Sequence, residues 1–231
     1  FFRENVLHWM DEYHVDGFRF DATHAIQDAS PRHVLAELSD AARAHARAGH
    51  APYLFAESNE NEVRYLRPTS DGCYGFDGAW ADDFHHTVRT LLTPARDGYL
   101  QSYAGTVDQL AATIAHGFLY EGQIDPFMGA PRGTNAREQS WRQFVFAIQN
   151  HDQVGNQALG LRLNPLVGLG DMLAAASLLL LLPETPLLFQ GQEFLASTPF
   201  LYFTDHNAEL GKLVTQGRRD EFAGFRAFRE P

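Results

Sequence analysis

Apolar residues recur at helical spacing in some segments of the chain and form short continuous runs in others. Apolar positions three or four residues apart predict a helix over residues 2–13. The pair Ser30-Pro31 predicts the start of a second helix, with Ser30 as its cap, which runs to about Ala48 because Gly49 ends it. Further helices are predicted over residues 82–92, 107–116 and 171–182. The last of these is apolar on all sides, which predicts that it is buried.

Short apolar runs between these helices predict strands. They cover residues 15–20, 52–56, 78–80, 144–148 and 186–189. Strand and helix alternate, and most of the strands are continuous apolar runs, as is typical of parallel strands covered on both faces. The sequence therefore predicts a parallel α/β sheet, either a barrel or an open doubly wound sheet. No linker or repeat divides the chain, which indicates one domain or part of one.

Polar and ionisable residues follow each predicted strand directly. The runs are Arg19-Phe20-Asp21, Ala56-Glu57-Ser58, Trp80-Ala81-Asp82-Asp83, Gln149-Asn150-His151-Asp152 and Gln190-Gly191-Gln192-Glu193. The C-terminal ends of the strands in a barrel share one face, and that face carries the chemistry. We therefore expect these side chains to line one site.

Three carboxylates in these runs suggest acid/base chemistry: Asp21, Glu57 and Asp152. Clustered carboxylates repel one another, so the pKa of at least one rises and that group keeps its proton near neutral pH. Arg19 lies on the same side of its strand as Asp21 and would hold it ionised, whereas Glu57 has no adjacent cation and is the better proton carrier. A single such residue is more often a helix cap or a turn residue. Three of them with an arginine favour a glycosidase pair.

Composition narrows the choice of ligand. With 231 residues, 45% of them hydrophobic and 13% aromatic, the chain is a folded protein and not a disordered one. A net charge of -11 and a single lysine, Lys212, argue against nucleic acid and suit a neutral ligand such as a sugar. The longest apolar run, 172–182, is too short to cross a membrane. The lone cysteine, Cys73, excludes an internal disulfide and, with no recognisable signal, favours the cytoplasm.

A metal site is the competing chemistry, because several histidines lie near acidic residues. They are His24, His85, His86, His151 and His206. No pair of them has the spacing of a chelate beside a strand-end carboxylate, and His85 and His86 are adjacent on a predicted helix and point apart. Nucleotide-binding glycine motifs and a serine nucleophile motif are also missing from the sequence. We therefore expect no metal, calcium included, and no other cofactor.

The strand-end runs resemble the motifs of the α-amylase family of retaining glycoside hydrolases. The similar segments are 16–22 for the fourth strand, 55–57 for the fifth and 149–152 for the seventh. The resemblance implies that Asp21 is the nucleophile, that Glu57 is the general acid and base, and that Asp152 stabilises the transition state. It also implies a partial TIM (β/α)8 barrel that runs from strand four to strand eight.

Further segments resemble the branch of that family that releases trehalose. They are 22–26, 30–33, 80–86, 150–156 and 197–206. This resemblance implies hydrolysis of the α-1,4 bond next to the terminal trehalose of maltooligosyl trehalose, with related α-glucans as further ligands. The residues that it places at the substrate are Arg19, His24, Asp83, Phe84, His86, Asn150 and His151. Trp80, Tyr202 and Phe203 either stack on sugars or belong to the core.

The resemblance to the family does not include the family's first three strands or its C-terminal β domain. We therefore expect residues 1–231 to be the C-terminal part of a catalytic barrel, with two unpaired strand edges. Such a segment by itself should be weakly stable or aggregate, and should be inactive. Two alternatives stay open: a branching enzyme with the same three carboxylates, and a glycan-binding remnant without catalysis.

Overall fold

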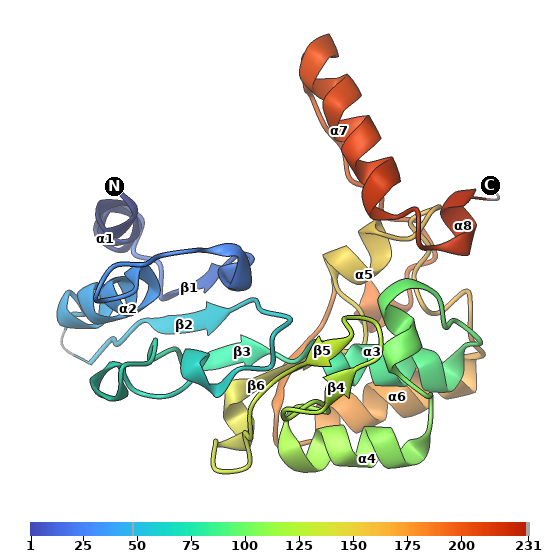
Figure 1. Ribbon diagram of the computed structural model, residues 1–231, viewed down its shortest axis with the longest axis horizontal. Helices are drawn as coiled ribbons and strands as arrows, with labels where there is room; N and C mark the ends of the chain where they lie inside the picture. The colour runs from blue at the N-terminus through green and yellow to red at the C-terminus, as the bar shows by residue number, and fades with distance from the viewer. Residues whose placement is uncertain (48, 230–231) are drawn as a thin grey trace.

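The computed structural model describes residues 1–47 and 49–229, and within them parallel strands form one five-stranded sheet (Figure 1). The strands of the sheet are β1 (Gly17–Phe20), β2 (Tyr53–Ala56), β3 (Gly78–Trp80), β6 (Phe144–Ala147) and β7 (Thr185–Leu187). A separate antiparallel hairpin consists of β4 (Ile124–Asp125) and β5 (Ala130–Pro131). The α-helices are α1 (Phe2–Glu12), α2 (Val34–Ala44), α3 (Asp82–Leu92), α4 (Val107–His116), α5 (His151–Gly155), α6 (Leu169–Leu181), α7 (Ala208–Glu221) and α8 (Arg226–Arg229). Short 3-10 helices cover Thr23–Ala25, Val63–Tyr65, Thr69–Asp71, Gly98–Ser102, Trp141–Gln143 and Gln192–Phe194.

The order of strands in the sheet is their order along the chain, β1-β2-β3-β6-β7. A doubly wound sheet reverses its strand order at a switch point, whereas a barrel adds each new strand beside the last. No such reversal occurs in the described part of this sheet, so the strands wind in one direction as they do in a barrel wall. The parallel α/β class that the sequence predicts is confirmed. Between β1 and β7 the described residues form no strand pairing, so the sheet is open.

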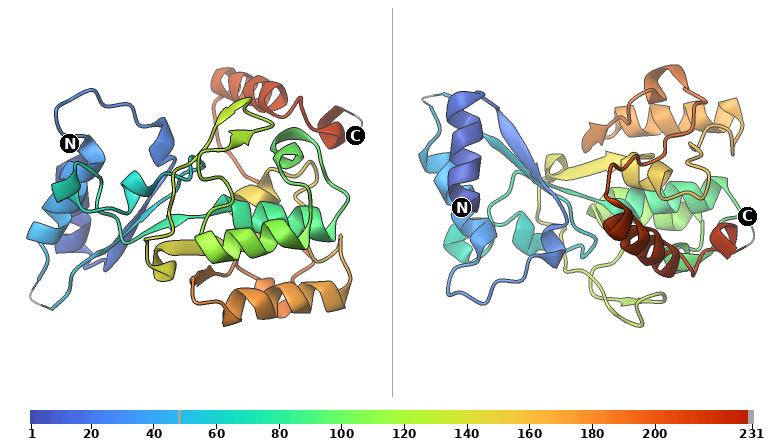
Figure 2. Two further views of the ribbon diagram at one scale, coloured as in Figure 1. Left: turned by 60° about the horizontal axis from the view of Figure 1, so that its bottom comes forward. Right: turned by 90° about the horizontal axis from the view of Figure 1, so that it is seen from above.

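Helices pack on the sheet and on one another in two groups. Helix α1 packs against α2 beside β1, and α3 packs against both α4 and β6 (Figure 2). Aromatic rings fill the space between these layers: Phe84 of α3 stacks on Phe146 of β6 with 4.3 Å between ring centroids. Phe20 of β1 stacks on Phe76 at 5.1 Å. These contacts fix the sheet, and the sheet fixes the positions of the strand ends.

Helix α2 begins later and ends earlier than the sequence predicts. Its N-cap is His33, whose ring accepts a hydrogen bond from the backbone N–H of Leu35 at 3.2 Å. The expected cap, Ser30, instead donates its hydroxyl to the carbonyl of Arg32, so it cannot serve the helix. The helix ends at Ala44, and the predicted end at residue 48 lies outside the described residues.

Helix α6 is buried on one face only, so the prediction of a wholly buried helix is wrong. Its buried residues are Met172, Ala175 and Leu179. On the other face, Leu173 is 53% exposed and Leu181 is 85% exposed. A helix that is apolar on all sides does not show which of its faces meets the sheet, and no described residue covers this second face sufficiently to bury it.

The predicted helices over 2–13, 82–92 and 107–116 correspond to α1, α3 and α4, whereas α5, α7, α8 and the β4–β5 hairpin have no counterpart in the apolar pattern. Helix α7 has no buried residue and projects from the rest of the molecule (Figure 1). None of the helices within residues 1–47 and 49–229 is long and apolar enough to span a membrane.

Candidate active site

Two of the predicted carboxylates lie at the ends of neighbouring strands. Strands β1 and β2 pair so that Phe20 is opposite Ala56, and the next residues are Asp21 and Glu57. The backbone N–H of Glu57 continues this ladder and donates to the carbonyl of Phe20 at 3.0 Å. After the strand, both the N–H and the hydroxyl of Thr23 donate to the carbonyl of Glu57, at 2.9 and 2.6 Å. Strand register therefore brings the two acids to the same edge of the sheet.

Arg19 joins these two carboxylates. One of its terminal nitrogens donates to Asp21 Oδ1 at 2.9 Å and the other is 2.7 Å from Glu57 Oε2. The guanidinium carbon lies 4.3 Å from the ring centroid of Trp80, at the end of the third strand. The stacking fixes the plane of the guanidinium, so that one rigid cation holds both acids.

Glu57 has the raised pKa that the sequence predicts for it. Its side chain is only 15% exposed, and burial raises its pKa to about 7. The backbone N–H of Ala22, 2.8 Å from Oε2, and the charge of Arg19 act in the opposite direction, while hydrogen bonds with Asp21 and Asp152 raise the pKa further. A carboxyl whose pKa is raised toward neutrality can both give and take a proton.

Asp152 joins the two acids from the fourth strand of the sheet order. It lies in the first turn of α5, where the side chain of Asn150 caps the helix and accepts the N–H of Asp152 at 2.9 Å and that of Gln153 at 3.1 Å. The phenol of Tyr202 donates to Asp152 Oδ1 at 2.8 Å, and His151 Nε2 is 3.5 Å from Oδ2. The ring of His151 meets Trp80 edge-on, with 6.0 Å between centroids.

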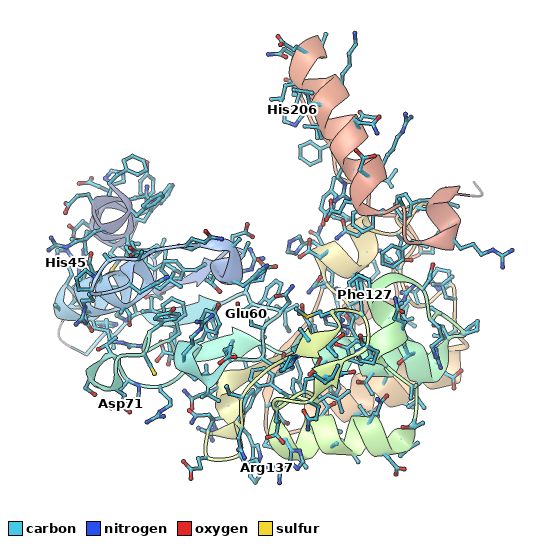
Figure 3. All side chains as sticks on the ribbon, in the orientation of Figure 1. His45, Glu60, Asp71, Phe127, Arg137 and His206 are labelled. Carbon is cyan, nitrogen blue, oxygen red and sulfur yellow. The ribbon has the colours of Figure 1, made fainter. Side chains whose placement is uncertain are left out.

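These carboxylates face a cleft of about 580 Å³. Asp21, Glu57 and Asp152 line it together with His24. The hairpin side of the cleft carries Phe127, which is 52% exposed and lies near the middle of the molecule (Figure 3). Three acids beside an open cleft with an apolar rim can hold a polar, uncharged ligand and move a proton on it.

Known proteins resemble this chain, and their names agree with the chemistry that the site allows. No protein-family model matches the chain. Over 228 residues it is 43% identical to the malto-oligosyltrehalose trehalohydrolase of Deinococcus radiodurans, a match that covers 97% of this chain and 36% of that protein. The enzyme of that name from Saccharolobus solfataricus is 38% identical over 222 residues, covering 96% of this chain and 38% of that protein.

The chain is homologous to malto-oligosyltrehalose trehalohydrolases. The resemblance seen in the sequence motifs is thereby confirmed. The chain spans less than two fifths of the length of these relatives.

Solved structures share the fold of this chain. A Salmonella typhimurium protein assigned as an alpha-amylase superposes with a TM-score of 0.88 at 41% identity, over 96% of this chain and 38% of that one. The cyclic alpha-maltosyl-(1→6)-maltose hydrolase of Arthrobacter globiformis gives a TM-score of 0.50 at 18% identity, over 97% of this chain and 43% of that one, which shows the fold alone.

Two of the predicted substrate residues of this trehalohydrolase homologue do not reach the cleft. Asp83 is fully buried, where it accepts hydrogen bonds from Asn61 at 2.6 Å and from Arg132 at 3.0 Å. Phe84 is also fully buried, in its stack on Phe146. Helix α3 begins at Asp82, and its first turn directs both side chains into the core. The prediction that they select the substrate is corrected: they hold the fold beneath the cleft.

Some of the other predicted substrate residues line the cleft or contact its acids, and others hold those acids in position. His24 lines the cleft, and Arg19 and His151 contact the acids that line it. Asn150 is buried and its side chain is used in capping α5, so it positions Asp152. His86 lines the cleft from a buried position, with Nδ1 3.1 Å from the hydroxyl of Tyr103, and burial lowers the pKa of His86 well below its ordinary value.

A buried arginine that lines the cleft escaped the sequence analysis. Arg132, which is 8% exposed, lies between Asp83 and Asp125 and is 3.0 Å from an oxygen of each. It also donates to the hydroxyl of Tyr103 at 3.0 Å and to the carbonyl of Asn59 at 2.8 Å. This network ties the β4–β5 hairpin to α3 at the side of the cleft. Residues 121–135 are rich in glycine and proline and show no apolar period, so no signal in the sequence marked them.

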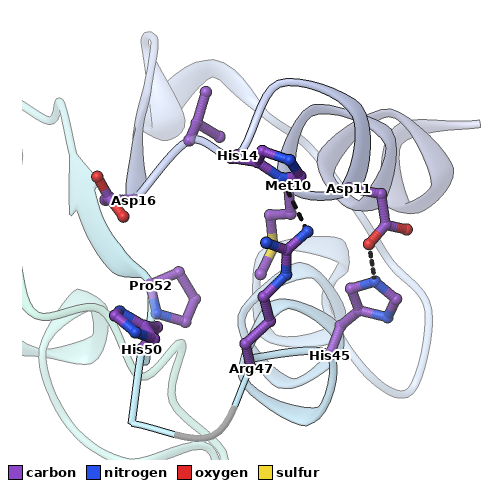
Figure 4. Close-up of a pocket in the computed structure, with 9 residues that line it drawn as sticks. Met10, Asp11, His14, Asp16, His45, Arg47, His50 and Pro52 are labelled. Atoms are coloured by element: carbon purple, nitrogen blue, oxygen red, sulfur yellow. Dashed lines mark hydrogen bonds and ion pairs between the residues drawn. The ribbon is translucent and has the colours of Figure 1, made fainter.

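A second cavity of about 240 Å³ is lined by His45, which lies at the left end of the molecule in Figure 3, away from Phe127 (Figures 3 and 4). Two pairs of side chains interact in it: His45 Nε2 lies 2.7 Å from Asp11 Oδ1, and Arg47 donates to His14 Nδ1 at 2.8 Å. These side chains therefore contact one another within the cavity. In the described part of the chain no three His, Cys, Asp or Glu side chains are grouped so that they could hold a metal ion.

Proposed function

We propose that the protein carrying this chain is a retaining glycosidase that cleaves the α-1,4 bond next to the terminal trehalose of maltooligosyl trehalose and releases trehalose. Relatives that are 36–43% identical are named for this activity. The observation that carries the proposal is the pair of Glu57 and Asp21 joined by Arg19, with the pKa of Glu57 at about 7. One acid that carries a proton beside a second carboxylate is the working arrangement of a glycosidase.

In the first step, protonated Glu57 donates its proton to the oxygen of the α-1,4 bond as that bond breaks. Asp21 attacks the anomeric carbon from the opposite face and forms a glycosyl ester. The sugar that carried the oxygen leaves as the released product. Arg19 offsets part of the negative charge of both carboxylates and so allows them to lie close together.

In the second step, Glu57 is ionised and removes a proton from water. The oxygen of that water attacks the anomeric carbon, the ester to Asp21 breaks, and Glu57 regains its proton. Asp152 accepts hydrogen bonds from sugar hydroxyls that strengthen as positive charge develops on the ring. Two inversions give net retention of configuration.

We also propose that β1, β2, β3, β6 and β7 are strands four to eight of a (β/α)8 barrel. Support comes from the unreversed strand order and from the superposition on the Salmonella protein. The proposal includes a cytoplasmic location, for which the single cysteine of the chain is the support.

The test compares the protein at its full natural length with its Glu57→Gln variant on maltooligosyl trehalose. Free trehalose is expected from the unchanged protein, and Glu57→Gln should lower kcat about a thousandfold, because glutamine cannot give or take the proton. Binding of the substrate to the variant should persist. Glu4→Gln on α1 is the matched control, since this glutamate is exposed and lies outside the cleft. An undiminished rate in Glu57→Gln, or α-1,6 branches in place of trehalose, would contradict the proposal.

A further inference from the structure

Tyr202 reaches Asp152 from the loop between β7 and α7, fifty residues further along the chain. Its hydroxyl donates to Asp152 Oδ1 at 2.8 Å and lies 3.2 Å from the carbonyl of His151. A phenol has one proton to give, so both contacts depend on the same hydroxyl pointing at the start of α5. The steps of the proposed mechanism do not involve this contact.

We propose that Tyr202 is a positioning residue for Asp152 and that Arg218 of α7 helps to hold it there. The loop and helix after β7 would then form part of the active site. This inference rests on the proposed function, because the orientation of Asp152 matters for turnover only if Asp152 stabilises the transition state.

The ring of Tyr202 packs directly on the backbone of α5. A Cβ atom at Gly155, the last residue of that helix, would lie 2.6 Å from Cζ of Tyr202, closer than real Cβ contacts. Only glycine therefore leaves room for the ring at this position. The hydroxyl is directed to Asp152 by a contact of the helix with the tyrosine and not by the hydrogen bond alone.

The loop that carries Tyr202 is anchored from below. The backbone N–H of Phe200 donates to the carbonyl of Gly160 at 2.9 Å, and the ring of Phe200 meets that of Phe189 edge-on at 5.3 Å. Buried Arg162 donates to the carbonyl of Thr198 at 2.9 Å. A loop held at both its backbone and its aromatic side chain presents Tyr202 in one place.

Arg218 connects the base of α7 to the same structure, where α7 approaches α5 in Figure 1. It donates to Asn156 Oδ1 at 2.6 Å, directly after α5. Its guanidinium carbon lies 5.6 Å from the ring centroid of Tyr202 and 4.5 Å from that of Phe222. A cation over two rings favours their present orientation. The projecting helix is therefore fixed to the active-site helix at its base.

The consequence for Asp152 is an assignment of its two oxygens. Oδ1 is engaged by Tyr202, which leaves Oδ2 beside His151. A carboxylate whose rotamer is set before the sugar arrives does not have to reorient in the transition state, and such preorganisation is a main source of catalytic rate. Burial, and after it the hydrogen bond to Asp152, raise the pKa of the Tyr202 phenol, which keeps it a donor at neutral pH.

The first experiment measures kcat and KM of Tyr202→Phe on maltooligosyl trehalose, in the protein at its full natural length. This change removes the hydroxyl and keeps the ring. A hydrogen bond to a charged group corresponds to a fall in kcat of roughly ten- to a hundredfold, with KM within about twofold, because the contact acts on the transition state. Tyr53→Phe, at the other end of β2 from Glu57, is the matched control and should match the unchanged protein.

The second experiment tests the contact without any turnover. The ¹³C resonance of Tyr202 Cζ, assigned by its loss in Tyr202→Phe, should move in Asp152→Ala and in Gly155→Ala, since the first removes the acceptor and the second displaces the ring. Gly170→Ala is the control, because this helical glycine has open space around it. A Cζ resonance that is unmoved in Asp152→Ala would overturn the inference.

The two experiments separate the failure of the inference from that of the proposed function. If the unchanged protein releases no trehalose, the proposed function fails and the resonance alone decides the contact. If it releases trehalose and Tyr202→Phe turns over at the same kcat, the proposed function stands and the positioning role is refuted.

Discussion

Arg19 acts on both carboxylates of the proposed catalytic pair, and its effect on Glu57 competes with burial. The guanidinium is 2.7 Å from Glu57 Oε2, which favours the ionised form. Burial nevertheless has the larger effect, because the pKa of Glu57 is raised and not lowered, to about 7. Burial therefore raises the pKa of Glu57 so that it can carry a proton, and Arg19 limits that rise.

Replacing Arg19 should move the alkaline limb of the pH–rate profile. In Arg19→Gln the opposing charge is lost, so the pKa of Glu57 rises above about 7 and the general acid stays protonated to higher pH. The alkaline limb of kcat/KM should shift upward by about one pH unit, and the rate should fall because the pair loses its bridge. The profile is measured with maltooligosyl trehalose, with Arg3→Gln on α1 as control. A limb that does not move, or that moves to lower pH, would refute this account.

The positions of the three proposed catalytic carboxylates were predictable from the sequence because these residues follow apolar strands. Asp21 and Glu57 take their positions from strand register, which the apolar runs reveal. Asp83 and Phe84 were misjudged because a helix begins between the strand and these residues, and residue type does not show which face of that helix is inward. The partner of Asp152 could not be foreseen, since Tyr202 arrives from a loop without any period.

At the scale of elements, a buried charge network fixes the hairpin beside the cleft. Arg132 is paired with Asp83 of α3 and with Asp125 of β4, and all three side chains are buried. Removing one member of a buried charged set leaves the others without compensation, which costs more than an exposed pair contributes. The hairpin should therefore depend on α3 for its position.

Asp83→Asn should destabilise the protein by about 3 kcal/mol, because Arg132 keeps its charge and loses one of its two carboxylates. Denaturant unfolding of the full-length protein would measure this, and exchange of backbone amides in residues 121–135 should become faster. Asp108→Asn, on the exposed start of α4, is the control and should cost less than about 1 kcal/mol. Equal stabilities for the two variants would show that the network does not hold the hairpin.

Elements that consist of apolar runs were predicted from the sequence. Elements whose existence or boundaries depend on side-chain contacts were missed or displaced. The five strands of the described sheet were all placed within a few residues. The start of α2 was displaced because its cap depends on whether His33 or Ser30 reaches the helix backbone. The strands of the β4–β5 hairpin have only two residues each, and α7 buries none of its residues, so no apolar pattern marks these elements.

At the scale of the whole molecule, the described sheet ends in two strands that do not pair with each other. These are β1 and β7. Apolar side chains stand exposed near both, including Trp9 at 41% on α1 and Leu180 at 55% on α6. Unpaired strand edges beside exposed apolar faces invite association with other chains. The sheet brings Asp21, Glu57 and Asp152 to one cleft and leaves its outer faces uncovered within the described residues.

The 231-residue chain expressed by itself should therefore be weakly stable or aggregate, and should not release trehalose. Sedimentation velocity would show association at micromolar concentration, and denaturant unfolding of any monomer should give less than about 5 kcal/mol. Replacing Leu173, Leu180 and Leu181 by glutamine should reduce association, because these leucines are exposed and contribute little to the core. Leu35→Gln is the contrast, since Leu35 is fully buried and its loss should unfold the chain. A monomer that unfolds cooperatively at higher stability and releases trehalose would contradict this prediction. The open edges and exposed helix faces would then not cause association or loss of stability.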